Sequence, residues 1–91
     1  MPITVHIPTP LRPECGGMGE LSVMATTVRE VLDRLEIEYP ALYRGVCNDA
    51  GAIRQHINLF VNNDFLHQRN GLETQLGPED VVYIMPAVSG G

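Results

Sequence analysis

Lysine and tryptophan are missing from the 91-residue sequence, and the six basic residues are all arginine. Eleven acidic residues give the chain a formal net charge of −5. Free nucleic acid and anionic membranes bind basic surfaces, so this charge balance predicts neither as a partner. No stretch approaches the roughly 20 apolar residues that a membrane-spanning helix needs. The N-terminus also lacks the basic and apolar regions of a secretory signal, so we expect a cytoplasmic protein.

Cysteine and histidine are scarce, and their spacing matches no familiar site. Cys15 and Cys47 stand far apart and form no zinc-binding pattern with the three histidines. In the cytoplasm both thiols should be reduced, and we interpret both as plain loop or packed cysteines rather than as thiols that accept sulfur. We therefore predict no metal site and no bound cofactor. No nucleophile–base pair stands out either, so nothing in the sequence indicates an enzyme.

Apolar residues make up 44% of the chain, and their alternation predicts strands. The length suits one domain. Prolines and Gly16-Gly17 between the first two strands predict a loop, and hence an antiparallel hairpin. A tight turn is predicted at Asn62-Asn63-Asp64. The predicted strands cover residues 3–7, 20–24, 57–62 and 81–85, with a short one at 65–67.

One amphipathic helix is predicted after the second strand. Thr27 and Glu30 form a capping box. Apolar residues then follow the spacing of one helical face, at Val28, Val31, Leu32 and Leu35. Pro40 should end the helix near residues 38–39. We predict a short helical turn and then a loop over residues 41–56.

The order of these elements predicts an α+β domain in which one sheet face packs on the helix. The last strand can lie at the centre, parallel to the first. In that arrangement Ile57, Leu59, Val61, Val82 and Ile84 face inward. We expect the domain to cover residues 1–86, with residues 87–91 as a flexible tail.

The tail ends in Gly90-Gly91 and has two interpretations. It is either an ordinary flexible end or a carboxylate that a second enzyme binds and activates, for example by adenylation. Glycine has no Cβ and therefore fits a narrow channel, and the last strand with Pro86 would give the tail a rigid base. The lack of lysine is either compositional drift or a benefit to a chain whose activated C-terminus an ε-amine would attack.

Several segments resemble one family in order along nearly the whole chain. They are the segment from Ile7 to Pro13 with Gly16-Gly17, the strand Asn58–Asn62, the closing half from Gly71 through Thr74 and Asp80 to Pro86, and the tail Pro86-Ala87-Val88-Ser89-Gly90-Gly91. The chain resembles the ThiS/MoaD family of ubiquitin-like sulfur carriers, and within it the CysO type that serves cysteine synthesis. A Gly-Gly in register with this strand pattern is the most specific feature. The segment from Arg44 to Arg54 matches no motif, and residues that set partner choice could lie there.

The resemblance implies a β-grasp fold, with a mixed sheet of four to five strands on one main helix. It also implies that an E1-like enzyme uses ATP and magnesium to adenylate the Gly91 carboxylate, which a sulfur donor then converts to a thiocarboxylate. Gly91 would carry the sulfur, while Gly90, Ser89 and Val88 give access. The acceptor would be a cysteine-synthase relative, and a metalloprotease would release the product. The chain would be a co-substrate and not an enzyme. As given, it ends at Gly91 and needs no trimming, although some relatives are made as longer precursors.

A partner-docking face is predicted on the sheet side away from the helix. Phe60, Tyr83 and Met85 should lie there, with Ala87 at the start of the tail. Exposed apolar residues beside the tail suit an activating enzyme. The alternatives are that a loop covers this face or that it is ordinary surface.

Three other functions stay open at this point. The sulfur could go to molybdopterin, thiamine or a secondary metabolite. The chain could instead be a ubiquitin-like protein modifier joined through Gly91 to lysines of its targets. It could also be a β-grasp interaction module with an inert tail. We expect a monomer when the chain is free.

Overall fold

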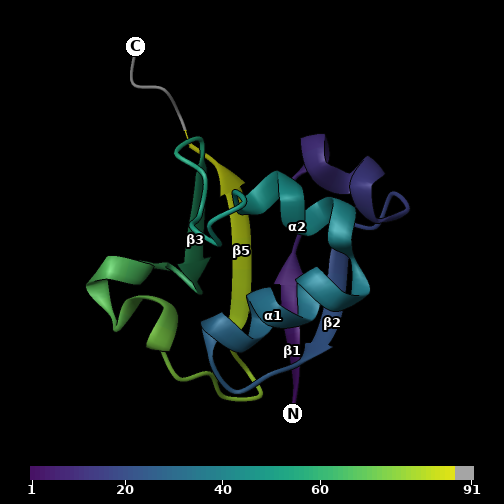
Figure 1. The fold of residues 1–91 in the computed structure, drawn as a ribbon. Coiled ribbons are helices and arrows are strands. Elements are labelled where there is room, and N and C mark those ends of the chain that lie inside the picture. The colour runs from purple at the N-terminus through teal and green to yellow at the C-terminus, as the bar shows by residue number, and fades with distance from the viewer. Residues whose placement is uncertain (88–91) are drawn as a thin grey trace.

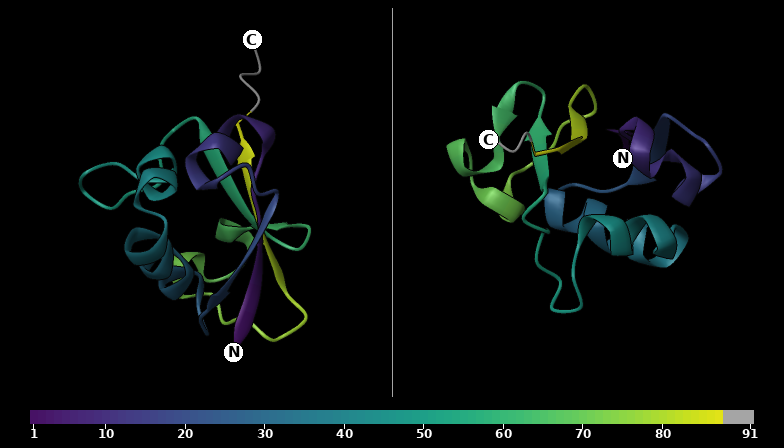
Figure 2. Two further views of the ribbon diagram at one scale, coloured as in Figure 1. Left: turned by 90° about the vertical axis from the view of Figure 1, so that its right-hand side faces the viewer. Right: turned by 90° about the horizontal axis from the view of Figure 1, so that it is seen from above.

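The computed structural model describes residues 1–87, which form a five-stranded sheet with helices on one face (Figures 1 and 2). The strands are β1 (Pro2–His6), β2 (Glu20–Met24), β3 (Ile57–Val61), β4 (Asp64–Phe65) and β5 (Val81–Pro86). The α-helices are α1 (Val28–Glu38) and α2 (Pro40–Val46). The 3₁₀ helices are η1 (Thr9–Cys15), η2 (Leu66–Gln68) and η3 (Gly71–Glu73).

The C-terminal strand lies at the centre of the sheet, as predicted. The order is β2-β1-β5-β3-β4, with β5 parallel to β1 and antiparallel to β3. The first two strands form the predicted antiparallel hairpin. Since β1 and β5 run in the same direction, the segment after β1 and the segment after β5 emerge at the same end of the sheet (Figure 1).

The core lies between the sheet and α1. All five residues predicted to face inward from β3 and β5 are buried. They pack in one cluster with the apolar stripe of α1, which consists of Val28, Val31, Leu32 and Leu35. The alternation of the strands and the helical spacing therefore direct the same apolar set into one interior.

The start of α1 differs in one detail from the predicted capping box. The Thr27 hydroxyl accepts the Glu30 N–H at 3.2 Å, as expected. The Glu30 carboxylate, however, accepts the backbone N–H of Thr26 at 2.7 Å and the Thr26 hydroxyl at 2.8 Å, rather than the N–H of Thr27. These bonds lower the pKa of Glu30. The helix ends at Glu38, before Pro40, as predicted.

The helical turn predicted after residue 41 is a seven-residue helix, α2. Pro40 starts it, because proline lacks only an N–H that the first turn leaves unused. Leu42 and Val46, one turn apart, are fully buried. Gly45 provides room for η1, since a Cβ there would lie 2.9 Å from Leu11 Cδ2. Packing against η1 thus accounts for a helix that local sequence alone underestimated.

Two predictions for the connecting segments are wrong. The Pro-rich stretch expected to be a loop forms η1, which ends where Gly16 takes a φ of 72°. The strand predicted at 65–67 is only Asp64–Phe65, followed by η2. The Phe65 N–H is bonded to the Gln68 side chain at 2.9 Å, so the chain turns away from the sheet there. No helix within residues 1–87 is long and apolar enough to cross a membrane.

Leu35 and Ile37 lie on the same helix and provide a matched test of the core. Leu35 is fully buried, whereas Ile37 is 71% exposed. We expect Leu35→Ala to lower the free energy of unfolding by about 2–5 kcal/mol because it leaves a cavity. Ile37→Ala should change it by less than about 0.5 kcal/mol. Urea denaturation followed by circular dichroism measures both, and equal losses would contradict this description of the core.

Candidate functional site

The base of the tail is held by the sheet up to Ala87. Pro86 lies opposite Ile57 in the β3–β5 register. One residue further, the Ala87 N–H donates to the His56 carbonyl at 2.7 Å. The predicted sulfur-carrying residue Gly91, and the access residues Gly90, Ser89 and Val88, lie outside the described residues. The domain boundary predicted at residues 86 and 87 stays a prediction.

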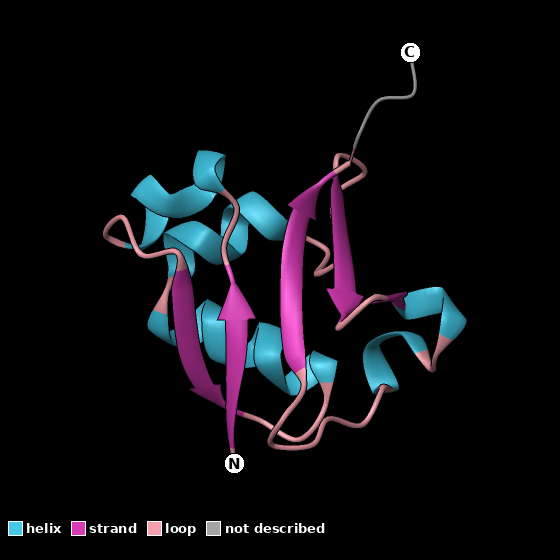
Figure 3. Ribbon diagram, turned by 180° about the vertical axis from the view of Figure 1, so that it is seen from behind, coloured by secondary structure: helices cyan, strands magenta, loops and turns pink. Residues whose placement is uncertain are grey.

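Figure 3 shows the sheet face that α1 and α2 leave open. Phe60, Tyr83 and Met85 alternate with buried residues of β3 and β5 and therefore lie on this face. Phe60 and Tyr83 are directly opposite each other on β3 and β5. With Met85, Asn62 and Asn63 they line an open hollow. Met85 is 39% exposed, and Phe60 and Tyr83 are half-buried. Ala87 does not line this hollow.

Aromatic and imidazole rings extend the hollow to both sides. The ring of Phe65 lies 4.4 Å from that of Phe60, and the ring of His67 lies 5.2 Å from that of Phe65. On the other side, His6 lies 5.4 Å from Tyr83. His6, Phe65 and His67 were not among the predicted docking residues. A two-residue hairpin loop at Asn62-Asn63 places Phe65 opposite Phe60. The turn signal at Asn62-Asn63 is therefore the sequence feature that indicates the position of Phe65.

A polar contact fixes the end of the hollow beside Asn62. Asn62 has a φ of 56°, which asparagine tolerates in such turns. Its side chain donates to the Asp80 carboxylate at 2.9 Å and accepts the Val81 N–H at 3.0 Å. The N–H of Gly77 and then the Asn62 amide lower the pKa of Asp80. The charged carboxylate thus ties the β3–β4 turn to the start of β5.

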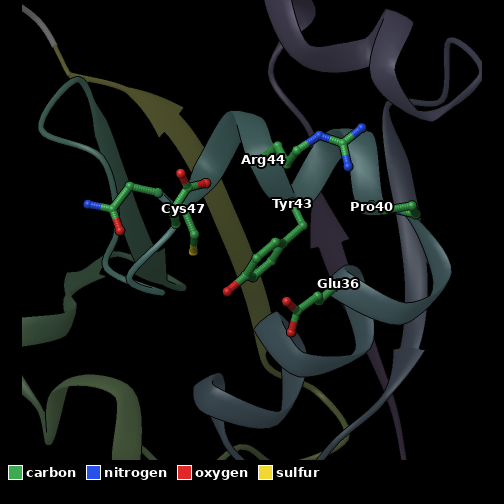
Figure 4. A pocket seen from close by; sticks show the side chains of 7 residues that line it. Glu36, Pro40, Tyr43, Arg44 and Cys47 are labelled. Carbon is green, nitrogen blue, oxygen red and sulfur yellow. The ribbon is translucent and has the colours of Figure 1, made fainter.

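Both cysteines are buried, which suits packed thiols. The Cys15 sulfur lies 3.4 Å from the Met18 carbonyl and 3.5 Å from that of Arg12. Cys47 lies beside Tyr43 in a second hollow, on the helical side (Figure 4). Burial raises the pKa of Cys47, although its hydrogen bond with Tyr43 works in the opposite direction. A protonated thiol is a poor nucleophile. Among residues 1–87, no three His, Cys, Asp or Glu side chains are grouped to hold a metal ion.

The fold defines the class of the protein. A five-stranded mixed sheet packed on a helix, with the last strand central, is the ubiquitin-like β-grasp arrangement. The sequence model of the ThiS family matches residues 5–91, and the chain belongs to this family.

Similar proteins share the whole domain. The chain is 34% identical to the sulfur carrier protein CysO of Mycobacterium tuberculosis over 93 aligned positions that cover both chains completely. The crystal structure of that organism's CysO matches with a TM-score of 0.84 and 33% identity, over 94% of this chain and 99% of CysO. A chain in the crystal structure of the BexX/CysO complex of Amycolatopsis orientalis matches with a TM-score of 0.84 and 31% identity, over 98% of this chain and 99% of the matched chain. The solution structure of the small archaeal modifier protein 1 of Methanosarcina acetivorans matches with a TM-score of 0.84 and 30% identity, over 99% of this chain and 96% of the modifier protein.

Proposed function

We propose that this chain is a sulfur carrier whose Gly91 carboxylate is activated and converted to a thiocarboxylate that supplies sulfur for cysteine biosynthesis. The observation that carries the proposal is the position of Gly90-Gly91. This pair ends a ThiS-family chain that aligns with CysO over its full length, four residues beyond the last residue that the sheet holds.

The chemistry requires two displacement steps at the terminal carbonyl. The Gly91 carboxylate attacks the α-phosphate of ATP, releases pyrophosphate and becomes an acyl adenylate. A sulfur nucleophile then adds to the carbonyl carbon, and AMP leaves. The E1-like activating enzyme would use ATP and magnesium, so this chain would bind no cofactor of its own. The chain is a co-substrate in this scheme rather than a catalyst, because its own terminal carboxylate is the group that is converted.

The length of the tail limits where activation occurs. The four residues after Ala87 span at most about 14 Å when fully extended. The activating site must therefore approach the end of the sheet where Ala87 bonds to His56. A base held by the sheet reduces the conformational entropy lost when the tail enters a channel, because the chain up to Ala87 is already in place.

The open sheet face is the docking surface in this proposal. Phe60, Tyr83 and Met85 provide apolar area, and Asn62 and Asn63 provide polar groups at its rim. An apolar centre with a polar rim is the usual composition of a protein interface. The BexX/CysO complex shows that a CysO protein forms a complex with another protein, which supports a partner enzyme here. The activator, the acceptor related to cysteine synthase and the releasing metalloprotease are proposed partners.

A second candidate function is protein modification through Gly91. It is favoured by the similarity to a small archaeal modifier protein at 30% identity over nearly the whole of both chains. Conjugation would give higher-mass forms of a tagged chain in its own cells, and these forms would disappear when Gly91 is deleted. Transfer of sulfur to molybdopterin, thiamine or a secondary metabolite would retain the same activation step.

Deletion of Gly91 tests the activation step. With the E1-like enzyme of the same organism, we expect the full chain to support ATP–pyrophosphate exchange, because its carboxylate forms the adenylate reversibly. The chain without Gly91 should support less than about a hundredth of that rate, since its carboxylate stops one residue short of the reacting position. Exchange at an undiminished rate would contradict the proposal and favour an interaction module with an inert tail.

The docking face can be tested with two aspartate variants. Phe60→Asp places a charge at the centre of the hollow, whereas Ile37→Asp places the same charge on the exposed side of α1. We expect Phe60→Asp to raise the KM for the carrier in the exchange assay roughly tenfold or more. Ile37→Asp should leave KM unchanged. Circular dichroism checks that both variants are folded, and an unchanged KM for a folded Phe60→Asp chain would refute docking on this face.

A further inference from the structure

The six arginines divide into two sets by what they contact. Three pair with carboxylates: Arg29 with Glu73 at 2.6 Å, Arg34 with Glu38 at 3.8 Å and Arg69 with Asp64 at 3.0 Å. The other three are Arg12, Arg44 and Arg54, and we call them the tail-end arginines. No carboxylate of residues 1–87 lies within ion-pair distance of any of them.

The tail-end arginines lie at the end of the molecule where the tail begins. Arg54 precedes β3, and its carbonyl accepts the N–H of Ile57, the first residue of that strand. Ile57 directly follows His56, whose carbonyl accepts the Ala87 N–H. The Arg54 Nε donates to the Arg44 carbonyl at 2.8 Å. Figure 1 shows η1, α2 and the base of the tail at this same end of the sheet.

Main-chain contacts hold two of these guanidinium groups in place. Arg12 Nε donates to the Ile7 carbonyl at 3.0 Å, just beyond the end of β1. Its guanidinium lies against Gly19, where a Cβ would be only 3.2 Å from Arg12 Cζ. Arg54 is held by its bond to Arg44. Because Nε makes these bonds, the two terminal nitrogens of each guanidinium can still donate to a partner. A side chain that is already held also loses less conformational entropy when it binds that partner.

Arg44 is the most accessible member of the set. It is exposed, and within residues 1–87 its guanidinium has neither a hydrogen bond nor an ion pair. Figure 4 shows its side chain pointing away from Tyr43 and Cys47. Glu36 and Asp49 line the same hollow, but neither forms an ion pair with Arg44. The segment 44–54 therefore presents positive charge on a chain whose net charge is −5.

We propose that the tail-end arginines form an electrostatic docking site for carboxylates on the enzyme that activates Gly91. This inference rests on the proposed function. The tail reaches at most about 14 Å beyond Ala87, so the activating enzyme must cover this end of the molecule. Guanidinium groups bind carboxylates through paired, charge-assisted hydrogen bonds. Such pairs guide a partner into register and speed its association.

Two triple variants of equal charge test the proposal. One is Arg12→Gln with Arg44→Gln and Arg54→Gln, and the other is Arg29→Gln with Arg34→Gln and Arg69→Gln. Each lowers the formal net charge of −5 by three, so a general effect of charge is the same in both. The readout is the KM for the carrier in ATP–pyrophosphate exchange with the purified activating enzyme, measured at several salt concentrations.

We expect the tail-end variant to raise KM roughly tenfold at low salt and to weaken its dependence on salt, with kcat nearly unchanged. The control variant should stay within about twofold of the wild type. Equal KM values for the two triple variants, or a salt dependence that survives in the tail-end variant, would overturn the proposal.

Single substitutions at Arg44 keep the test valid if the tail-end triple variant fails to fold. Arg44→Gln removes no bond within residues 1–87, and it should raise KM about threefold. Arg44→Lys should restore most of this loss because it keeps the charge. A KM that Arg44→Gln leaves unchanged would refute the docking site alone. Exchange that persists at the wild-type rate in the chain lacking Gly91 would instead refute the proposed function, and the docking site with it.

Discussion

The position of β5 between β1 and β3 is the constraint on which the rest of the structure depends. On one side β1 pairs with Val81–Tyr83, and on the other β3 pairs with Val82–Pro86, so at least one neighbour holds every residue of the C-terminal strand. The Ala87–His56 bond continues this support by one residue. A central strand is the part of a sheet that opens least readily, because both of its edges are hydrogen-bonded. The fold thus carries the start of the tail on a strand whose last residues are held by β3.

The same strand divides the molecule into an inner and an outer face. Val82 and Ile84 point into the core, while Tyr83 and Met85 alternate with them on the open side. Because the period of a strand is two, core and docking face are specified together, and a one-residue slip would exchange them. The bond between Asn62 and Asp80 fixes the register where β5 begins. Stability and recognition are therefore linked through a few residues of one strand.

Local patterns were sufficient for most of the fold. The alternation in β1, β2 and β3 and the helical spacing of α1 depend on neighbours within a few residues, and these elements were predicted. The extent of α2 depends on Leu11 packing against Gly45, a contact between distant segments. The two-residue strand β4 is too short for a period to show. The Glu30 side chain also bonds one residue earlier than the usual capping pattern suggests.

The candidate site was also predicted only in part, because some of its residues come together through contacts between distant segments. Alternation placed Phe60, Tyr83 and Met85 on one face, and the structure joins them in one hollow. His6 reaches the site only through the parallel pairing of β1 with β5. The division of the arginines could not be read from sequence, because it depends on contacts such as that between Arg29 and Glu73, which lie 44 residues apart. Composition gave the number of arginines but not which of them are neutralised.

The most direct test of the central claim is the intact mass of the chain after incubation with its activating enzyme, ATP and a sulfide source. The account predicts a gain equal to the replacement of one oxygen by sulfur, located by fragmentation at Gly91. An unchanged mass, in a mixture where the enzyme does form the adenylate, would contradict the assignment of this chain as a sulfur carrier.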